Sequence, residues 1–131
     1  MIVVDASAAV ELLLGRSAGD KVERLIDQHH APLAPAAIDA EVFVALRRLY
    51  LTGRITKERA IRAILELRDL PVERIPLQPL LEAAAIHLDR FGGHDVFYAL
   101  IALQHGCPLV TRDARFARAA ATIGVGTIAV S

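Results

Sequence analysis

The 131-residue sequence lacks several features that would place it in a narrow class of protein. It has a single cysteine, Cys107, so no internal disulfide can form, and we expect a reducing, cytoplasmic environment. It has no tryptophan and only 5% aromatic residues, so the core must be built from Ala, Leu, Val and Ile. Fifteen basic residues balance fifteen acidic ones, which excludes the global positive field of many nucleic-acid binders. Any contact with nucleic acid would therefore need a local basic patch.

Long hydrophobic runs are also missing, since no apolar stretch reaches the roughly 18 residues that would suggest a membrane span. The first residues lack a basic start and carry Asp5 and Glu11 within their apolar stretch, which argues against a signal peptide. We therefore expect no membrane association. The hydrophobic fraction of 54% and mean hydropathy of +0.42 are nevertheless high, and such an excess is often found in a subunit or partner interface.

Short runs rich in Val and Ile alternate with longer segments of helical period, a pattern that favours the α/β class with a central parallel sheet. Prolines in the second and third expected strands favour strand ends or sheet edges. We find no repeat or linker and expect one domain over residues 1–131. The expected strands are 2–4, 31–35, 72–77, 108–111 and 127–130. The expected helices are 6–14, 18–29, 36–52, 56–69, 78–90, 94–105 and 113–121.

The connection between the third and fourth expected helices carries clear signals for a helix end and a helix start. Gly53 follows the apolar "LRRLYLT" segment and suits a left-handed C-terminal cap. Thr56 then stands where an N-cap is expected. Residues 36–69 are therefore predicted to form a helical hairpin.

Three aspartates stand where strands end or helices begin. Asp5 follows the strand 2–4, Asp113 follows the strand 108–111, and Asp95 follows a glycine pair at the start of a helix. Each alone is best explained as a helix N-cap. If strands 2–4 and 108–111 are neighbours, however, Asp5 and Asp113 share one edge of the sheet, where ligands of parallel sheets gather.

Carboxylates placed together in this way favour a metal ion. Two unit charges about 4 Å apart repel by about 4 kcal/mol at an effective dielectric constant of about 20. A divalent cation converts that repulsion into coordination. Oxygen ligands without clustered cysteine or histidine favour Mg²⁺ or Mn²⁺ over zinc.

Four segments in this order resemble the PIN-domain ribonucleases, and specifically the VapC-type toxins of bacterial toxin–antitoxin pairs. They are "MIVVDASAAVELLL", "DAEVFVALRRLYLTGRI", "HDVFYALIALQHGCPLVTRDARFARAA" and "GVGTIAV". The resemblance is weakest over residues 15–35 and 54–90. It implies a single PIN-like domain whose central parallel sheet has about five strands, flanked by about seven α-helices.

The resemblance also implies a set of site residues. The family's acidic cluster, which is both catalytic and metal-binding, falls on Asp5, Glu41, Asp95 and Asp113. The hydroxyls of its "D-A-S" and "T-R-D" motifs fall on Ser7 and Thr111, which would orient a carboxylate, a metal-bound water or a phosphate.

Helical periodicity alone does not choose between Glu41 and Asp39, which flank the expected buried face of their helix on opposite sides. The family's "E-V-x-x-A-L-R-R" pattern chooses Glu41. Glu11, six residues after Asp5, is expected to be exposed or at an interface.

Basic residues near these motifs are candidates for contact with RNA phosphates. For all of them, a solvated helix face or pairing with acidic residues is an equally good explanation. They are Arg112, Arg115, Arg118 and His94.

The implied function is a Mg²⁺- or Mn²⁺-dependent endoribonuclease that hydrolyses RNA phosphodiester bonds. As a toxin it would form a homodimer and be inhibited by a cognate VapB-like antitoxin, which in this family occupies an apolar groove of the early helices. Two alternatives remain. One is a non-catalytic interaction module with the same fold. The other, ranked last, is an aspartate-based phosphotransfer domain, because Ser7 breaks the D-x-D pattern and no lysine follows a late strand.

Overall fold

The computed structural model describes residues 1–130, and within them five parallel strands form one sheet. The order across the sheet is β3-β2-β1-β4-β5, so the first strand lies in the centre. The predicted α/β class with its parallel sheet is therefore confirmed. The strands are β1 (Ile2–Val4), β2 (Pro32–Pro35), β3 (Glu73–Ile75), β4 (Leu109–Thr111) and β5 (Thr127–Ala129).

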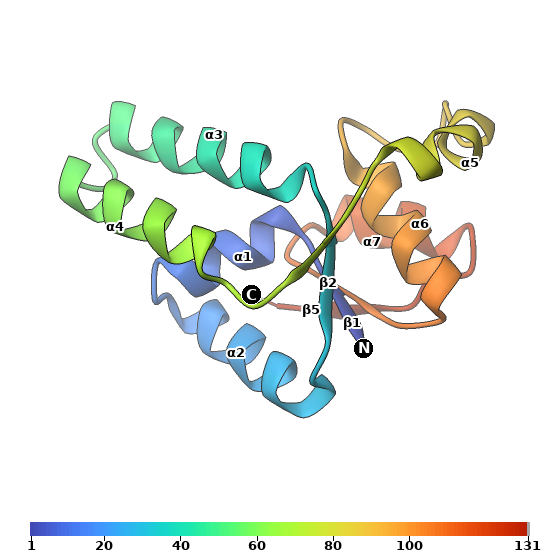
Figure 1. Ribbon diagram of the computed structural model, residues 1–131, viewed down its shortest axis with the longest axis horizontal. Helices are drawn as coiled ribbons and strands as arrows, with labels where there is room; N and C mark the ends of the chain where they lie inside the picture. The colour runs from blue at the N-terminus through green and yellow to red at the C-terminus, as the bar shows by residue number, and fades with distance from the viewer. Residues whose placement is uncertain (131) are drawn as a thin grey trace.

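Helices cover both faces of this sheet. Figure 1 shows α1 to α4 on one side of the strands and α5 to α7 on the other. The seven α-helices within residues 1–130 are α1 (Ala6–Leu13), α2 (Ser17–His29), α3 (Ile38–Leu51), α4 (Lys57–Arg68), α5 (Leu81–Ile86), α6 (Asp95–His105) and α7 (Ala114–Ala121), and a 3₁₀ turn, η1 (Gln78–Leu80), precedes α5. None of these described helices combines the length and apolar character needed to span a membrane.

The central position of β1 explains its uninterrupted apolar sequence. All three of its residues are fully buried, because helices pack on both faces of the sheet and strands flank both edges of β1. Pro32 and Pro35 stand at the two ends of β2, as expected for residues without a backbone N–H. The core is mainly aliphatic, and Tyr98 and Phe116 are its buried aromatic residues.

The predicted hairpin of α3 and α4 is confirmed together with its end signals. Gly53 has φ +75°, the left-handed conformation expected just after a helix. The Thr56 Oγ1 atom accepts a hydrogen bond from the Arg59 backbone N–H at 3.1 Å and so caps α4. The chain therefore reverses within a few residues, and the two helices pack side by side (Figure 1).

The prediction of one helix over residues 78–90 is wrong. The segment forms the 3₁₀ turn and only six α-helical residues, and it then continues as turns up to the glycine pair 92–93. α5 buries none of its residues, and Ile86 and Leu88 are 77% and 79% exposed. A short helix gains most of its stability from packing. Because α5 lacks buried residues, tertiary packing does not extend the helix beyond Ile86.

Gly19 sets the close approach of α1 and α2. A Cβ atom added at Gly19 would lie 2.3 Å from the carbonyl oxygen of Glu11 and 2.8 Å from the Cα of Leu12. Both of these are backbone atoms of α1, so they cannot move without displacing the helix. Only glycine permits this contact.

We predict that Gly19→Ala destabilises the protein by about 3 kcal/mol, because α1 and α2 must separate to admit the methyl group. Chemical denaturation would measure this loss. Gly126→Ala is the control, since its Cβ meets no atom within 4 Å. Equal stability of the two variants would show that the two helices are not in tight contact.

Candidate active site

Asp5 lies directly after β1, and both of its carboxylate oxygens are held by hydrogen bonds. Oδ1 accepts from the Ser7 hydroxyl at 2.7 Å and from the Ala8 backbone N–H at 2.9 Å. Oδ2 accepts from the Thr111 hydroxyl. Asp5 therefore caps α1, as expected, and is also fixed to the neighbouring strand β4.

The contact between Asp5 and Thr111 follows from the register of the sheet. β1 and β4 are parallel, and Val4 pairs with Val110, so the next residue of each strand lies at the same level. Thr111 Oγ1 also accepts from the Asp113 backbone N–H at 3.0 Å. Ser7 Oγ in turn accepts from the Arg112 backbone N–H at 3.1 Å. The two hydroxyls thus connect Asp5 to the turn that carries Asp113.

Asp113 caps α7 with one of its two carboxylate oxygens. Its Oδ1 accepts from the backbone N–H groups of Arg115 at 2.9 Å and Phe116 at 3.2 Å. Within residues 1–130, its Oδ2 accepts no hydrogen bond, so this oxygen remains available to a ligand.

Glu41 comes from α3 and reaches toward α6. The Tyr98 hydroxyl donates to Glu41 Oε1 at 3.0 Å, and His94 Nδ1 lies 3.7 Å from the same oxygen. Asp39, the alternative that periodicity left open, instead pairs with Arg74 at 3.0 Å. The two acidic residues of α3 therefore have different partners, and only Glu41 joins the other carboxylates.

Asp95 is placed differently from the expectation that it caps a helix. His94 is the N-cap residue, with φ −95° and ψ 3° and no side-chain cap, and Asp95 is already the first residue of α6. The helix thus begins one residue after the expected start at 94, with His94 in the capping position and Asp95 in the first turn. In residues 1–130, no hydrogen bond fixes the Asp95 carboxylate.

Neighbouring carboxylate charges act on the ionisation of Asp5, Glu41 and Asp95, and Asp113 supplies one of these charges, which places the four groups in one cluster. Burial, followed by the charges of Asp5, Asp113 and Glu41, raises the pKa of Asp95 from 3.8 to about 6. Burial also raises the pKa of Asp5, although three hydrogen bonds to its carboxylate oppose the change. The pKa of Glu41 is raised mainly by burial, against the opposing effects of Tyr98 and His94. The charged form of this cluster is thus costly.

The chemistry of this donor set fits a hard divalent cation, since it consists of carboxylate oxygens with hydroxyls behind them. In residues 1–130, no three His, Cys, Asp or Glu side chains are arranged to hold one ion between them. The carboxylates are therefore gathered at one edge of the sheet but are not drawn together into a complete ligand shell.

Glu11 is the residue whose environment the sequence analysis placed wrongly. It is only 3% exposed, and its Oε1 accepts from Arg16 at 3.2 Å and from Arg112. The close approach of α1 and α2 at Gly19 buries it. Arg112, a candidate for RNA contact, thus has an acidic partner. The spacing of Glu11 from Asp5 did not indicate the pair of Glu11 with Arg112, because Arg112 is distant in sequence.

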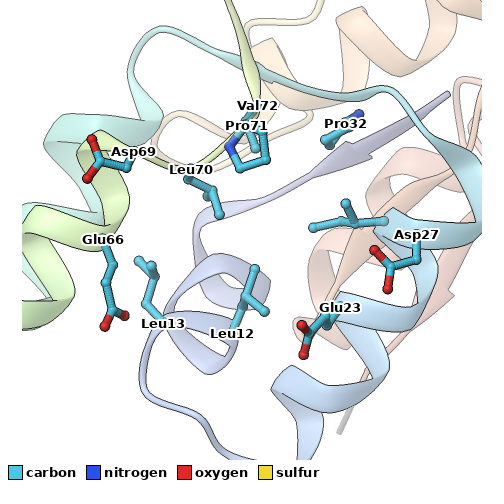
Figure 2. Close-up of a pocket in the computed structure, with 11 residues that line it drawn as sticks. Leu12, Leu13, Glu23, Asp27, Pro32, Glu66, Asp69, Leu70, Pro71 and Val72 are labelled. Atoms are coloured by element: carbon cyan, nitrogen blue, oxygen red, sulfur yellow. The ribbon is translucent and has the colours of Figure 1, made fainter.

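Two hollows in the surface differ in their relation to these carboxylates. One, of about 270 Å³, is bounded by Asp95 and Asp113. The other, of about 460 Å³, lies between α1, α2, α4 and the segment leading to β3. Figure 2 shows four carboxylates around its apolar interior, and none of them belongs to the cluster described above. They are Glu23, Asp27, Glu66 and Asp69.

Comparison with known proteins gives consistent results. The family model of the PIN domain matches residues 2–122. Ribonuclease VapC12 of Mycobacterium tuberculosis is 36% identical over 118 residues, which cover 90% of this chain and 91% of the relative. Ribonuclease VapC3 of the same organism is 40% identical over 118 residues, covering 90% and 86%.

Solved structures agree at the level of the fold. The crystal structure of a protein from Pyrobaculum aerophilum matches with a TM-score of 0.72 at 23% identity, over 96% of this chain and 82% of that one. A domain from Methanocaldococcus jannaschii, described as functionally unknown, matches with a TM-score of 0.57 at 21% identity, over 99% and 90%.

The chain therefore belongs to the PIN-domain family. Within this family it is similar to the VapC ribonucleases, and the resemblance drawn from its four sequence segments is confirmed. Membership implies the general use of a divalent metal ion.

We predict that Asp95→Asn stabilises the metal-free protein at neutral pH. The folded-state pKa of Asp95 lies above its ordinary value, so the folded state binds this proton more tightly than the unfolded chain. Its contribution to stability is therefore greatest below about pH 4 and is lost as the pH rises to about 6. Because solvent screens this half-buried group, we expect the variant to gain about 1 kcal/mol.

Thermal unfolding in chelator at pH 4 and pH 7 measures this difference. Asp20→Asn is the matched control, because Asp20 is also a first-turn aspartate but is exposed and is not among the charges that act on Asp5, Glu41 or Asp95. A lower melting temperature for Asp95→Asn than for the wild type at pH 7 would contradict the repulsion described here.

Proposed function

We propose that this protein is a metal-dependent endoribonuclease that acts as the toxin of a VapBC-like toxin–antitoxin pair. The observation that carries the proposal is the cluster of four carboxylates at the carboxyl edge of the sheet, in which the charges of the other three raise the pKa of Asp95. Its relationship to proteins named ribonucleases over nearly their full length supports the same activity. Family membership supports the requirement for a divalent cation.

The proposed ligands of that cation are Asp5, Glu41, Asp95 and Asp113, and we expect Mg²⁺ or Mn²⁺ because the donors are hard oxygens. When bound, such an ion supplies activation of a water molecule and neutralisation of charge on the phosphoryl group of RNA. The ligands are oriented by their neighbours. Ser7 and Thr111 hold Asp5, and the Tyr98 hydroxyl holds Glu41.

Asp95 is the best placed of the four to accept a proton from the attacking water. It borders the hollow beside the cluster, together with Asp113. Its carboxylate also makes no hydrogen bond within residues 1–130, in contrast to Asp5, whose two oxygens are both occupied. We therefore propose Asp95 as the general base, and Asp5 as a fixed anchor of the site.

We predict that the purified protein cleaves RNA with Mg²⁺ or Mn²⁺ and not in chelator. Asp5→Asn and Asp95→Asn should each lower the rate at least about a hundredfold, since each removes a charge from the reacting centre. Incubation with a mixed cellular RNA pool, followed by sizing of the products, measures this. Asp20→Asn is the matched control and should retain full activity.

Full activity in chelator, or equal activity of Asp5→Asn and wild type, would overturn the nuclease assignment. Absence of cleavage in every sample would instead favour the non-catalytic interaction module that shares this fold.

We also propose a cytoplasmic homodimer. The observation that supports self-association is the apolar surface of α5 and the turn after it. Leu81, Ile86 and Leu88 are 55%, 77% and 79% exposed there. Burial of such side chains in a subunit interface would account for part of the high hydrophobic fraction.

The hollow of Figure 2 is the proposed binding site for the VapB-like antitoxin. Its interior is apolar, with Leu12, Leu13 and Val72 among the lining residues, and its four charged lining residues are all acidic. This combination fits an amphipathic segment with apolar side chains along one face and lysine or arginine beside them.

We predict that Asp27→Lys combined with Glu66→Lys weakens antitoxin binding at least about tenfold, because it places two positive charges against a basic segment. Both residues are exposed, one on α2 and the other on α4. Calorimetry with the cognate antitoxin measures the change. Asp20→Lys with Glu58→Lys is the matched control, since it reverses one charge on each of the same helices outside the hollow. Equal weakening by both pairs would contradict the proposed site.

A further inference from the structure

The smaller hollow adjoins the carboxylate cluster, and most of the residues that line it are not among the proposed metal ligands. It has a volume of about 270 Å³ and lies between the loop after α5 and the start of α7. Asp95 and Asp113 form the wall that it shares with the cluster. A group bound here would therefore lie beside the reacting phosphodiester of a substrate.

Two arginines line this hollow and leave their charges available. Arg90 and Arg115 are both exposed, and neither forms an ion pair with any residue of the described chain. Arg90 Nη1 donates to the Thr122 hydroxyl at 3.4 Å, and the backbone of Arg115 is held by Asp113. The positive charges of Arg90 and Arg115 offset the negative charges of the nearby carboxylates, so a polyanion can approach.

The interior of the hollow is aromatic. Phe91 and Phe116 pack edge to face, with ring centroids 6.0 Å apart and an interplanar angle of 85°. Phe116 is buried, whereas Phe91 is half-buried and accessible from the hollow. Aromatic rings and arginine side chains are the groups on which single-stranded RNA bases stack.

Gly92 lines this hollow without a side chain. A Cβ atom added there would meet no atom within 4 Å, and the residue does not have the left-handed conformation that its neighbour Gly93 adopts with φ +53°. The absence of a side chain is thus not required by the backbone. A side chain introduced at Gly92 would therefore begin in open space at the lining of the hollow.

We propose that this hollow is a subsite for one nucleobase of single-stranded RNA, next to the phosphodiester that is cleaved. The volume lies below the range of roughly 300–1,000 Å³ of pockets for larger ligands, which suits a single planar group. The subsite gives the enzyme a base preference at one position beside the cut. This inference rests on the proposed nuclease function and specifies how its substrate is selected.

The test is Gly92→Leu in the full chain, assayed with Mn²⁺ on a randomised single-stranded RNA pool whose cut ends are sequenced. We expect KM to rise about tenfold, with kcat changed less than about threefold, because base stacking is lost while the carboxylates remain. The base preference at one position beside the cut should disappear. Arg115→Ala should weaken the same base preference. If Gly92→Leu melts at a lower temperature than the wild type, the result with Arg115→Ala decides whether the subsite exists.

Gly126→Leu is the matched control, because a Cβ at Gly126 also meets no atom within 4 Å and Gly126 does not line this hollow. Unchanged KM and base preference in Gly92→Leu and Arg115→Ala, with a cleaving wild type, would overturn the subsite and leave the nuclease function intact. A wild type that cleaves no RNA would overturn both.

Discussion

The parallel pairing of β1 with β4 is the constraint on which the rest of the site depends. It places Asp5 level with Thr111, so that two residues 106 positions apart share a hydrogen bond at the end of the sheet. The β4 pairing also brings the turn with Asp113 to the same edge, and α6 packs across the centre of the sheet to bring Asp95 there. A shift of β4 by one residue would direct Thr111 to the other face and break this arrangement.

The carboxylate cluster is costly for the folded state and therefore points to function. Three hydrogen bonds to the Asp5 carboxylate and one to that of Glu41 oppose the rise in pKa that burial causes. The Asp95 carboxylate has no such bond within residues 1–130, and its pKa rises to about 6. Proteins retain ionisable side chains whose charge is unfavourable in the folded state mainly where a ligand or a reaction uses them. A divalent cation at this edge would remove the repulsion, so metal binding and stability are coupled.

Much of the fold was predictable, because strand and helix periods depend on local sequence. The sequence predicted the five strands and the number of α-helices, seven, that residues 1–130 contain. The failure at residues 78–90 arose because helix length depends on tertiary packing, and α5 buries no residue. The resemblance to a family singled out Glu41, whereas the buried pair of Glu11 with Arg112 depends on a contact between distant segments that no local pattern signals. The hollow beside Asp95 could not be predicted from the sequence either, since the loop of Gly92 and α7 are distant in sequence and come together only in the folded protein.

Repulsion from neighbouring carboxylates raises the pKa of Asp95, and a divalent cation bound among them would relieve it. Titration of the Asp95 carboxyl carbon by NMR, in chelator and then with excess Mg²⁺, tests this most directly. We expect a pKa of about 6 in chelator and a clear decrease when Mg²⁺ is present. A pKa close to the ordinary value of 3.8 in chelator, or one that does not change with Mg²⁺, would contradict it.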